Sequence, residues 1–305
     1  MAHTIGRRLA ELHSALADPA ADDPAFSPER ADAAQAGQHA AQAIATLQGA
    51  LQVLAAHRLS GSGKLGGWPE TLADGHAEWL QDHADALTRA IRERACLEQD
   101  SLYLRIHGDF HLGQVLVARR AGAGTDIGTD AYLVDFEGEP ARPFAQRRAK
   151  STPLRDVAGL LRSFDYAAAA MLSFPGPLTG PACATETLGI VNKKPMASEP
   201  APQVRREALL SRFLVRARSA FLQGYHAVAD QAPHPWLKCG AEHSLLELAL
   251  LERAAYEVCY EAAHRPDWLC IPAAGLAELA RGMLASPSTE KEAPFEAPQT
   301  PSSEK

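Results

Sequence analysis

The sequence is poor in several features that mark particular classes of protein. Its net charge of −7 leaves no basic footprint of the kind that nucleic-acid-binding proteins carry. Its five cysteines do not form C-x-x-C pairs, so the pattern predicts free thiols in a reducing cytoplasm rather than a disulfide framework or a zinc site. No apolar run reaches about 18 residues, and the N-terminus has no continuous apolar segment. We therefore expect a cytoplasmic protein that binds neither nucleic acid nor a membrane.

Common nucleotide-binding motifs are also absent. The chain has no G-x-x-x-x-G-K-[ST] and no V-A-I-K-like strand before Tyr103. Residues 61–66, G-S-G-K-L-G, match G-x-G-x-x-G, but nucleotide loops of this form follow a strand, and here both flanks predict helix. We interpret this segment as a connection between helices. A strand-rich nucleotide lobe is therefore not predicted upstream of Tyr103.

Helical patterns dominate what is present. With 305 residues, 46% of them hydrophobic and 22% charged, the chain has the composition of a globular protein with a sizeable core. Apolar spacing and capping residues predict helices over residues 5–16, 28 to about 57, 72 or 76 to 96, 153 onward, 209–229 and 243–264. Residues 174–203 are rich in proline and predict an inserted surface loop. Residues 286–305 predict a disordered tail.

The most informative stretch is 103–139, where two short apolar runs bracket a polar loop and a third run ends in a carboxylate. It reads Y-L-R-I-H-G-D-F-H-L-G-Q-V-L-V-A and, after a glycine-rich turn, A-Y-L-V-D-F-E-G-E. In this order Asp109 comes first, Gln114 follows in the same loop, and Asp135 ends the next strand-like run. A kinase catalytic loop has a base Asp, then an amide ligand for Mg²⁺, then a second metal-binding Asp after a hairpin. The spacing therefore predicts a phosphoryl-transfer site.

The strings around these residues resemble a known family. H-G-D-x-H is the form seen in the aminoglycoside and choline phosphotransferase branch of the kinase superfamily. R-I-H-G-D-F-H-L-G-Q-V-L, V-D-F-E-G-E-P-A-R-P and Y-E-x-x-Y-E-x-x-x-R-P-D-W are similar to maltokinase, from about Gly6 to Leu284 outside the proline-rich segment. The resemblance implies an α+β, predominantly helical fold. It would be a protein-kinase-like C-terminal lobe over residues 1–285 with a small catalytic β-hairpin, the N-terminal nucleotide lobe being missing.

The resemblance also implies roles for the residues of the polar loop. Maltokinases use ATP to phosphorylate the anomeric hydroxyl of maltose, and they often occur fused behind trehalose synthase. Asp109 would then be the catalytic base, and His107 would support the loop or touch the sugar. Gln114 and Asp135 would bind Mg²⁺, with Glu137 as a further carboxylate beside the metal. Gln at position 114 and Glu at position 137 fit this family better than the antibiotic kinases.

Residues 243–264 contain the candidate binding surface for the molecule that accepts the phosphate. Arg253, Tyr256 and Tyr260 follow one another at helical spacing, on a face other than the apolar one. Two tyrosines one turn apart suit the rings and hydroxyls of a disaccharide, but the same pattern also describes a solvated face with tyrosines at its edge. The resemblance implies that these three residues hold maltose. The family usually has Lys in place of Arg253, and a guanidinium does not replace an ammonium directly.

Two further residues have more than one interpretation. Asp156 resembles the buried Asp of the kinase fold that hydrogen-bonds the backbone of the catalytic loop, and it fits a surface salt bridge equally well. His13, in the first predicted helix, is interpreted as a packing or capping residue rather than a ligand.

The prediction for function is ATP-dependent phosphorylation of maltose, or a related disaccharide, to the 1-phosphate. Two alternatives remain open. The chain could be a lobe fragment that is inactive alone or depends on a separate N-terminal lobe or a trehalose synthase partner. It could also be a kinase of the aminoglycoside phosphotransferase type for another small molecule, such as an aminoglycoside, choline or homoserine.

Overall fold

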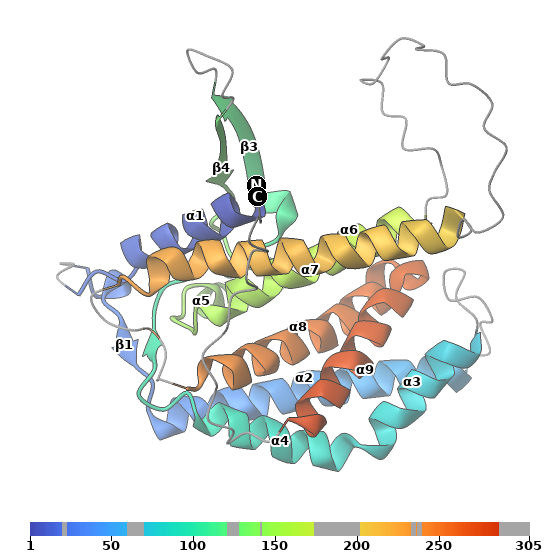
Figure 1. Ribbon diagram of the computed structural model, residues 1–305. Helices are drawn as coiled ribbons and strands as arrows, with labels where there is room; N and C mark the ends of the chain where they lie inside the picture. The colour runs from blue at the N-terminus through green and yellow to red at the C-terminus, as the bar shows by residue number, and fades with distance from the viewer. Residues whose placement is uncertain are drawn as a thin grey trace, which may run out of the picture.

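The computed structural model describes residues 1–19, 23–59, 70–120, 128–140, 142–173, 202–232, 236 and 240–286. These residues form a predominantly helical body with one projecting hairpin (Figure 1). The main helices are α1 (Ala2–Ala15), α2 (Ala33–Leu59), α3 (Glu70–Asp82), α4 (Ala84–Cys96), α6 (Leu154–Ser173), α7 (Pro202–Ala229), α8 (Glu242–His264) and α9 (Cys270–Ala285). Shorter helical turns are α5 (Phe144–Arg147), η1 (Pro24–Phe26), η2 (Leu112–Gln114) and η3 (Pro266–Trp268).

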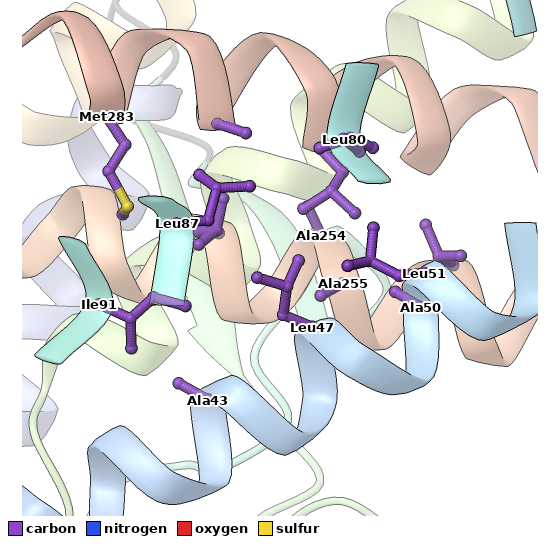
Figure 2. Packing of buried hydrophobic residues seen from close by; sticks show 14 of the residues in the cluster. Ala43, Leu47, Ala50, Leu51, Leu80, Leu87, Ile91, Ala254, Ala255 and Met283 are labelled. Atoms are coloured by element: carbon purple, nitrogen blue, oxygen red, sulfur yellow. The ribbon is translucent and has the colours of Figure 1, made fainter. Parts of the chain in front are cut away.

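One hydrophobic core joins α2, α3, α4, α8 and α9, whose apolar side chains meet in Figure 2. Helix α8 takes part through Leu251, Ala255 and Val258, which form its apolar face. By length and composition the segment Pro266–Ala285 could cross a membrane, yet Leu276 and Met283 within it are buried in this core.

A second core gathers α1, α6 and α7 beside the N-terminal end of α8. Helix α1 lies along α7 in Figure 1, and glycines on both helices permit this close approach. A Cβ on Gly6 would overlap the carbonyl oxygen of Phe221, and a Cβ on Gly224 would overlap that of His3. Phe221 is fully buried, whereas Phe213 on the same helix is 46% exposed.

The hairpin consists of β3 (Val115–Arg120) and β4 (Gly128–Leu133), paired antiparallel with Val115 opposite Leu133. It extends away from the helices in Figure 1. Helix α1 holds its base, because the guanidinium of Arg8 donates two hydrogen bonds of 3.0 and 2.6 Å to the carboxylate of Asp130. The predicted catalytic hairpin is therefore present, and it is attached to the helical body at the end that carries the polar loop.

The first long helix begins later than predicted. Ser27 and Pro28 do not start α2, because residues 29–30 form strand β1 (Glu29–Arg30), which pairs with β2 (Leu102–Tyr103). The actual cap is Asp32, whose carboxylate accepts a 2.7 Å hydrogen bond from the Gln35 N–H while the Gln35 side chain accepts one of 2.9 Å from the Asp32 N–H. This reciprocal pair satisfies two free N–H groups at the helix start. The sequence indicated no strand in this region, and β1 corrects that expectation for Glu29 and Arg30.

The single helix predicted up to Cys96 is two helices. It breaks at His83, whose ring hydrogen-bonds the carbonyl oxygen of Trp79 at 2.8 Å. After the break, α3 packs chiefly against α9, and α4 packs chiefly against α2.

Several predicted segments lie outside the described residues: the glycine-rich connection 61–66, residues 174–201 of the proline-rich segment and residues 287–305 of the tail. Helix α7 already begins at Pro202, so the last two residues of the predicted loop 174–203 are helical. The three cysteines within the described ranges, Cys96, Cys259 and Cys270, are free thiols.

Candidate active site

The polar loop between β2 and β3 is held from beneath by Asp156 on α6. This side chain is almost completely buried, and its two oxygens accept hydrogen bonds from the backbone N–H groups of His107 (2.7 Å) and Gly108 (2.9 Å). Burial alone would raise the pKa of Asp156, but the hydrogen bond and charge of His13 and the loop N–H groups outweigh it and lower the pKa. Asp156 therefore supports the polar loop and does not form a surface salt bridge.

His13 is the second support beneath the loop. It is fully buried, with Nε2 3.0 Å from Asp156 and Nδ1 3.0 Å from the hydroxyl of Tyr225 on α7. The structure thus places it as a packing residue, as predicted, and adds a polar role that its position in the first helix did not suggest. Through His13, helices α1 and α7 share in fixing the carboxylate on which the loop rests.

The side chain of His107 is buried behind the loop. Its ring nitrogen Nε2 is 2.9 Å from the carbonyl oxygen of Val134, and the ring packs between Phe110 and Phe136 with centroid separations of 5.3 and 5.2 Å. Because Val134 immediately precedes Asp135, this contact joins the catalytic loop to the strand end that carries the second acid. The geometry corresponds to the loop-supporting role of the two that the sequence suggested for His107.

The residues predicted to bind metal lie on the open side of the loop. Gln114 and Asp135 contact one another, the Gln114 amide nitrogen donating a 2.8 Å hydrogen bond to an Asp135 carboxylate oxygen. Asp135 has a left-handed backbone conformation (φ 69°) and its side chain is exposed. Glu137 is also exposed. In the described part of the chain no three His, Cys, Asp or Glu side chains converge as a metal-binding group.

This donor set fits Mg²⁺ better than a transition metal. Mg²⁺ is usually held by one or two carboxylates together with waters and substrate phosphates, rather than by a closed cage of side chains. Asp135 supplies a carboxylate, and rotation of the Gln114 amide places its oxygen where its nitrogen now contacts Asp135. The pair can therefore provide the protein part of a magnesium site.

Beside the loop is a cleft of about 690 Å³, within the usual range for small-molecule sites. Asp109 lies in its wall together with the three residues predicted on the tyrosine-bearing helix, now α8: Arg253, Tyr256 and Tyr260. The guanidinium of Arg253 is 3.8 Å from an Asp109 oxygen and lies over the ring of Tyr256, 5.3 Å from its centroid. The helix face is therefore the wall of a cavity and not simply a solvated surface.

Acidic residues that the sequence did not single out complete this cleft. Glu257 and Glu261 on α8 and Glu139 after β4 lie in its wall, and all three are buried. Glu257 accepts hydrogen bonds from Arg162 (2.9 Å) and Arg253 (3.3 Å). Burial lowers the pKa of Arg253, but the neighbouring carboxylates, Glu257 first and then Asp109, outweigh it and raise that pKa. The four-residue spacing of Glu257 and Glu261 was the signal available in the sequence.

The chain has detectable similarity to sugar kinases. No protein-family model matches it. Its sequence is 30% identical over 175 residues to the glucosamine kinase of Mycolicibacterium smegmatis, a match that covers 57% of this chain and 33% of that protein. It is 25% identical over 174 residues to the glucosamine kinase of Streptacidiphilus jiangxiensis, covering 57% and 31% respectively.

Solved structures of glucosamine kinase are also similar to this chain. A glucosamine kinase in complex with glucosamine, ADP and inorganic phosphate superposes with a TM-score of 0.61 at 22% identity, covering 91% of this chain and 51% of that one. A second crystal form of glucosamine kinase gives the same values. The chain therefore spans about a third of its curated relatives and about half of these structures. These comparisons show a predominantly helical, kinase-like fold shared with sugar kinases, and they do not single out maltokinase.

Proposed function

We propose that this chain carries the acceptor-binding and catalytic part of an ATP-dependent sugar kinase. The observation that carries this proposal is that Asp109 lies in the wall of the α8 cleft, on the same loop that leads to the Gln114–Asp135 pair. A base at the boundary between an acceptor cleft and a metal-phosphate site is the arrangement that phosphoryl transfer to a hydroxyl requires.

In this reaction Asp109 accepts the proton of the sugar hydroxyl, a role typically worth about 10² to 10⁴ in rate. Asp156 and His13 keep the loop rigid, so that the carboxylate of Asp109 stays aimed into the cleft. The guanidinium of Arg253 lies 3.8 Å from an oxygen of Asp109 and helps to hold that carboxylate in place. Mg²⁺, held by Asp135 and Gln114, would neutralise charge on the phosphates of ATP.

An amino sugar such as glucosamine is the acceptor that we favour. The relatives and solved structures are glucosamine kinases, and the cleft wall carries several carboxylates that suit an ammonium group. Maltose is the second candidate, because Tyr256 and Tyr260 follow one another along the cleft with ring centroids 6.1 Å apart and offer two stacking positions for sugar rings.

Nucleotide binding in this proposal needs residues beyond those described. Neither a glycine-rich loop between strands nor a strand lysine occurs within the described ranges. We infer that the ATP-binding site is completed by another part of a longer polypeptide or by a partner chain. The candidates that the sequence suggested are a separate nucleotide lobe and a trehalose synthase fusion.

The test is an assay of ADP release with ATP, Mg²⁺ and a panel containing glucosamine, maltose and choline. The chain is assayed alone and fused to the part of the Mycolicibacterium smegmatis glucosamine kinase that it does not cover. We expect turnover with glucosamine in the fusion, and a loss of about 10² to 10⁴ in kcat in Asp109→Asn with an unchanged thermal midpoint. Full turnover in that variant would remove Asp109 from the role of base. Turnover with choline alone would overturn the sugar acceptor.

A further inference from the structure

Glu139 is an unusual member of the acceptor cleft. It follows Gly138, which has a left-handed backbone (φ 73°), and only 4% of it is exposed. Its oxygen Oε2 accepts a 2.6 Å hydrogen bond from Nε of Arg142, whereas among the described residues the buried oxygen Oε1 has no hydrogen-bond partner of good geometry. Burial and the carboxylate of Glu139 raise the pKa of the neighbouring Tyr256. A buried carboxylate oxygen without a partner costs free energy, so such atoms usually signal a missing water or ligand. Because Glu139 lies in the wall of the cleft with Asp109, a bound acceptor can supply that partner.

The orientation of Glu139 is determined by a row of buried and partly buried charges behind it. Arg142 contacts Glu139 through Nε, and its Nη2 lies 3.9 Å from Glu252 on α8. Glu252 in turn is 2.9 Å from Nε2 of His39 on α2, and Nδ1 of the same ring is 2.8 Å from Glu98. The row therefore alternates in sign from Glu98 through a protonated His39, Glu252 and Arg142 to Glu139.

The row is anchored at its far end. Glu98 also accepts a hydrogen bond from the hydroxyl of Tyr103, the residue that ends β2 and leads into the catalytic loop. His39 must donate from both ring nitrogens to satisfy two carboxylates, which requires its charged form. Burial opposes that form, but the hydrogen bonds to Glu252 and Glu98 outweigh it and raise the pKa of His39 to about 10. The charge is therefore present throughout the physiological range.

We propose that Glu139 is a further acceptor-binding residue, which takes a hydrogen bond from a hydroxyl or ammonium group of the sugar through Oε1, and that His39 is the positioning residue that fixes it through Glu252 and Arg142. This inference rests on the proposed sugar-kinase function. The competing explanation is a water molecule: a cavity of about 40 Å³ beside Glu139, Arg142 and Glu252 has room for one. A water bound there would stabilise the fold without making sugar affinity depend on Glu139.

The test is sugar affinity of the full chain, measured by titration calorimetry with glucosamine and with maltose. Glu139→Gln keeps the shape of the side chain and removes its charge. Because hydrogen bonds to charged groups contribute more than neutral ones, we expect affinity for the preferred sugar to fall by about tenfold to a hundredfold. Glu278→Gln, an exposed carboxylate on α9, is the matched control and should bind as the wild type does.

His39→Gln tests the positioning role, with His243→Gln on the exposed surface as its control. We expect a smaller loss of affinity than in Glu139→Gln, and in a nucleotide-complete fusion a raised KM with kcat nearly unchanged, which a general loss of fold would not produce. If Glu139→Gln binds sugar as tightly as the wild type, the inference is overturned and the water explanation stands. If the wild-type chain binds neither sugar, the proposed function and this inference fall together. If it binds sugar but no fusion transfers phosphate, only the proposed function is overturned.

Discussion

The two sides of the catalytic loop differ in how they are supported. On the acceptor side, Asp156 and His13 are buried beneath the loop, and the cleft wall is tied to the helical core by ion pairs such as Arg162–Glu257. On the side of the predicted metal ligands, Asp135 is exposed, and its carboxylate accepts a hydrogen bond from the amide of Gln114.

In the proposed reaction, the difference means that the cleft for the acceptor is rigid before the substrates bind, whereas the metal site is not. Acceptor binding benefits from a rigid wall, because ordering the side chains on binding would cost free energy. A magnesium site of the kind that Asp135 suits also takes ligands from substrate phosphates, so its protein part can stay open until the nucleotide arrives. The following substitutions test whether the contrast is real.

Asp156→Asn should have the largest effect. The amide would place an N–H group against the N–H of His107 or Gly108, leaving buried donors unpaired beside His13. We expect the free energy of unfolding to fall by about 3–5 kcal/mol, as for other broken buried pairs, in urea denaturation followed by circular dichroism. Asp230→Asn, whose side chain is 75% exposed, is the control. Equal stability of the two variants would show that the loop does not depend on this buried carboxylate.

His39→Gln should follow, with a dependence on pH. The raised pKa of His39, about 10 against an ordinary 6.5, means that its contribution to stability is complete below pH 6.5 and is lost as pH rises through 10. The pKa of Glu252 is lowered from 4.5 to about 2, since His39 outweighs burial, so its contribution is complete above pH 4.5 and is lost as pH falls towards 2.

The stability difference between wild type and His39→Gln should therefore be greatest between pH 4.5 and 6.5, at about 3 kcal/mol or more, and shrink towards pH 10. Chemical denaturation at several pH values measures it. A difference that does not change between pH 6 and pH 10 would contradict a charged His39.

Gly159→Ala tests how closely α6 supports the loop. A Cβ at this position would overlap the carbonyl oxygen of Phe110, which follows Asp109. The helix or the loop must shift, and we expect a loss of about 1–3 kcal/mol, as in other overpacked sites. Gly37→Ala on α2, where a Cβ meets nothing within 4 Å, should instead gain about 0.4–1 kcal/mol. Thermal unfolding of the two variants compares them, and similar shifts of the same sign would mean that the loop is loosely packed.

Asp135→Asn should change stability least, by less than about 0.5 kcal/mol, because its side chain is exposed. Asn also tolerates the left-handed backbone of this position (φ 69°). Binding of Mn²⁺, followed by water proton relaxation, should nevertheless weaken. A large loss of stability would show that the metal side is as firmly built as the acceptor side.

The sequence pattern predicted the catalytic hairpin, most helices and the face of α8 that lines the cleft. Those features are local: a motif within some thirty residues, or an apolar repeat along one helix. The pattern misplaced the start of α2, because the side-chain cap that begins this helix is Asp32. It also missed the break at His83, because tertiary packing overrides the apolar repeat there. It also missed the charged row behind Glu139, because His39 lies 59 residues from Glu98 and 213 from Glu252.

By itself the sequence indicated which groups could do the chemistry: Asp109 as a candidate base, Gln114 and Asp135 as candidate metal ligands, and a helix face with two tyrosines. Tertiary structure alone decided that Asp156 is buried beneath the loop, that Asp109 lies in the wall of one cleft with Arg253, and that Glu139 is held beside them. The physical reason is that burial sets both the position and the charge of these groups, and burial depends on helices that are far apart along the chain.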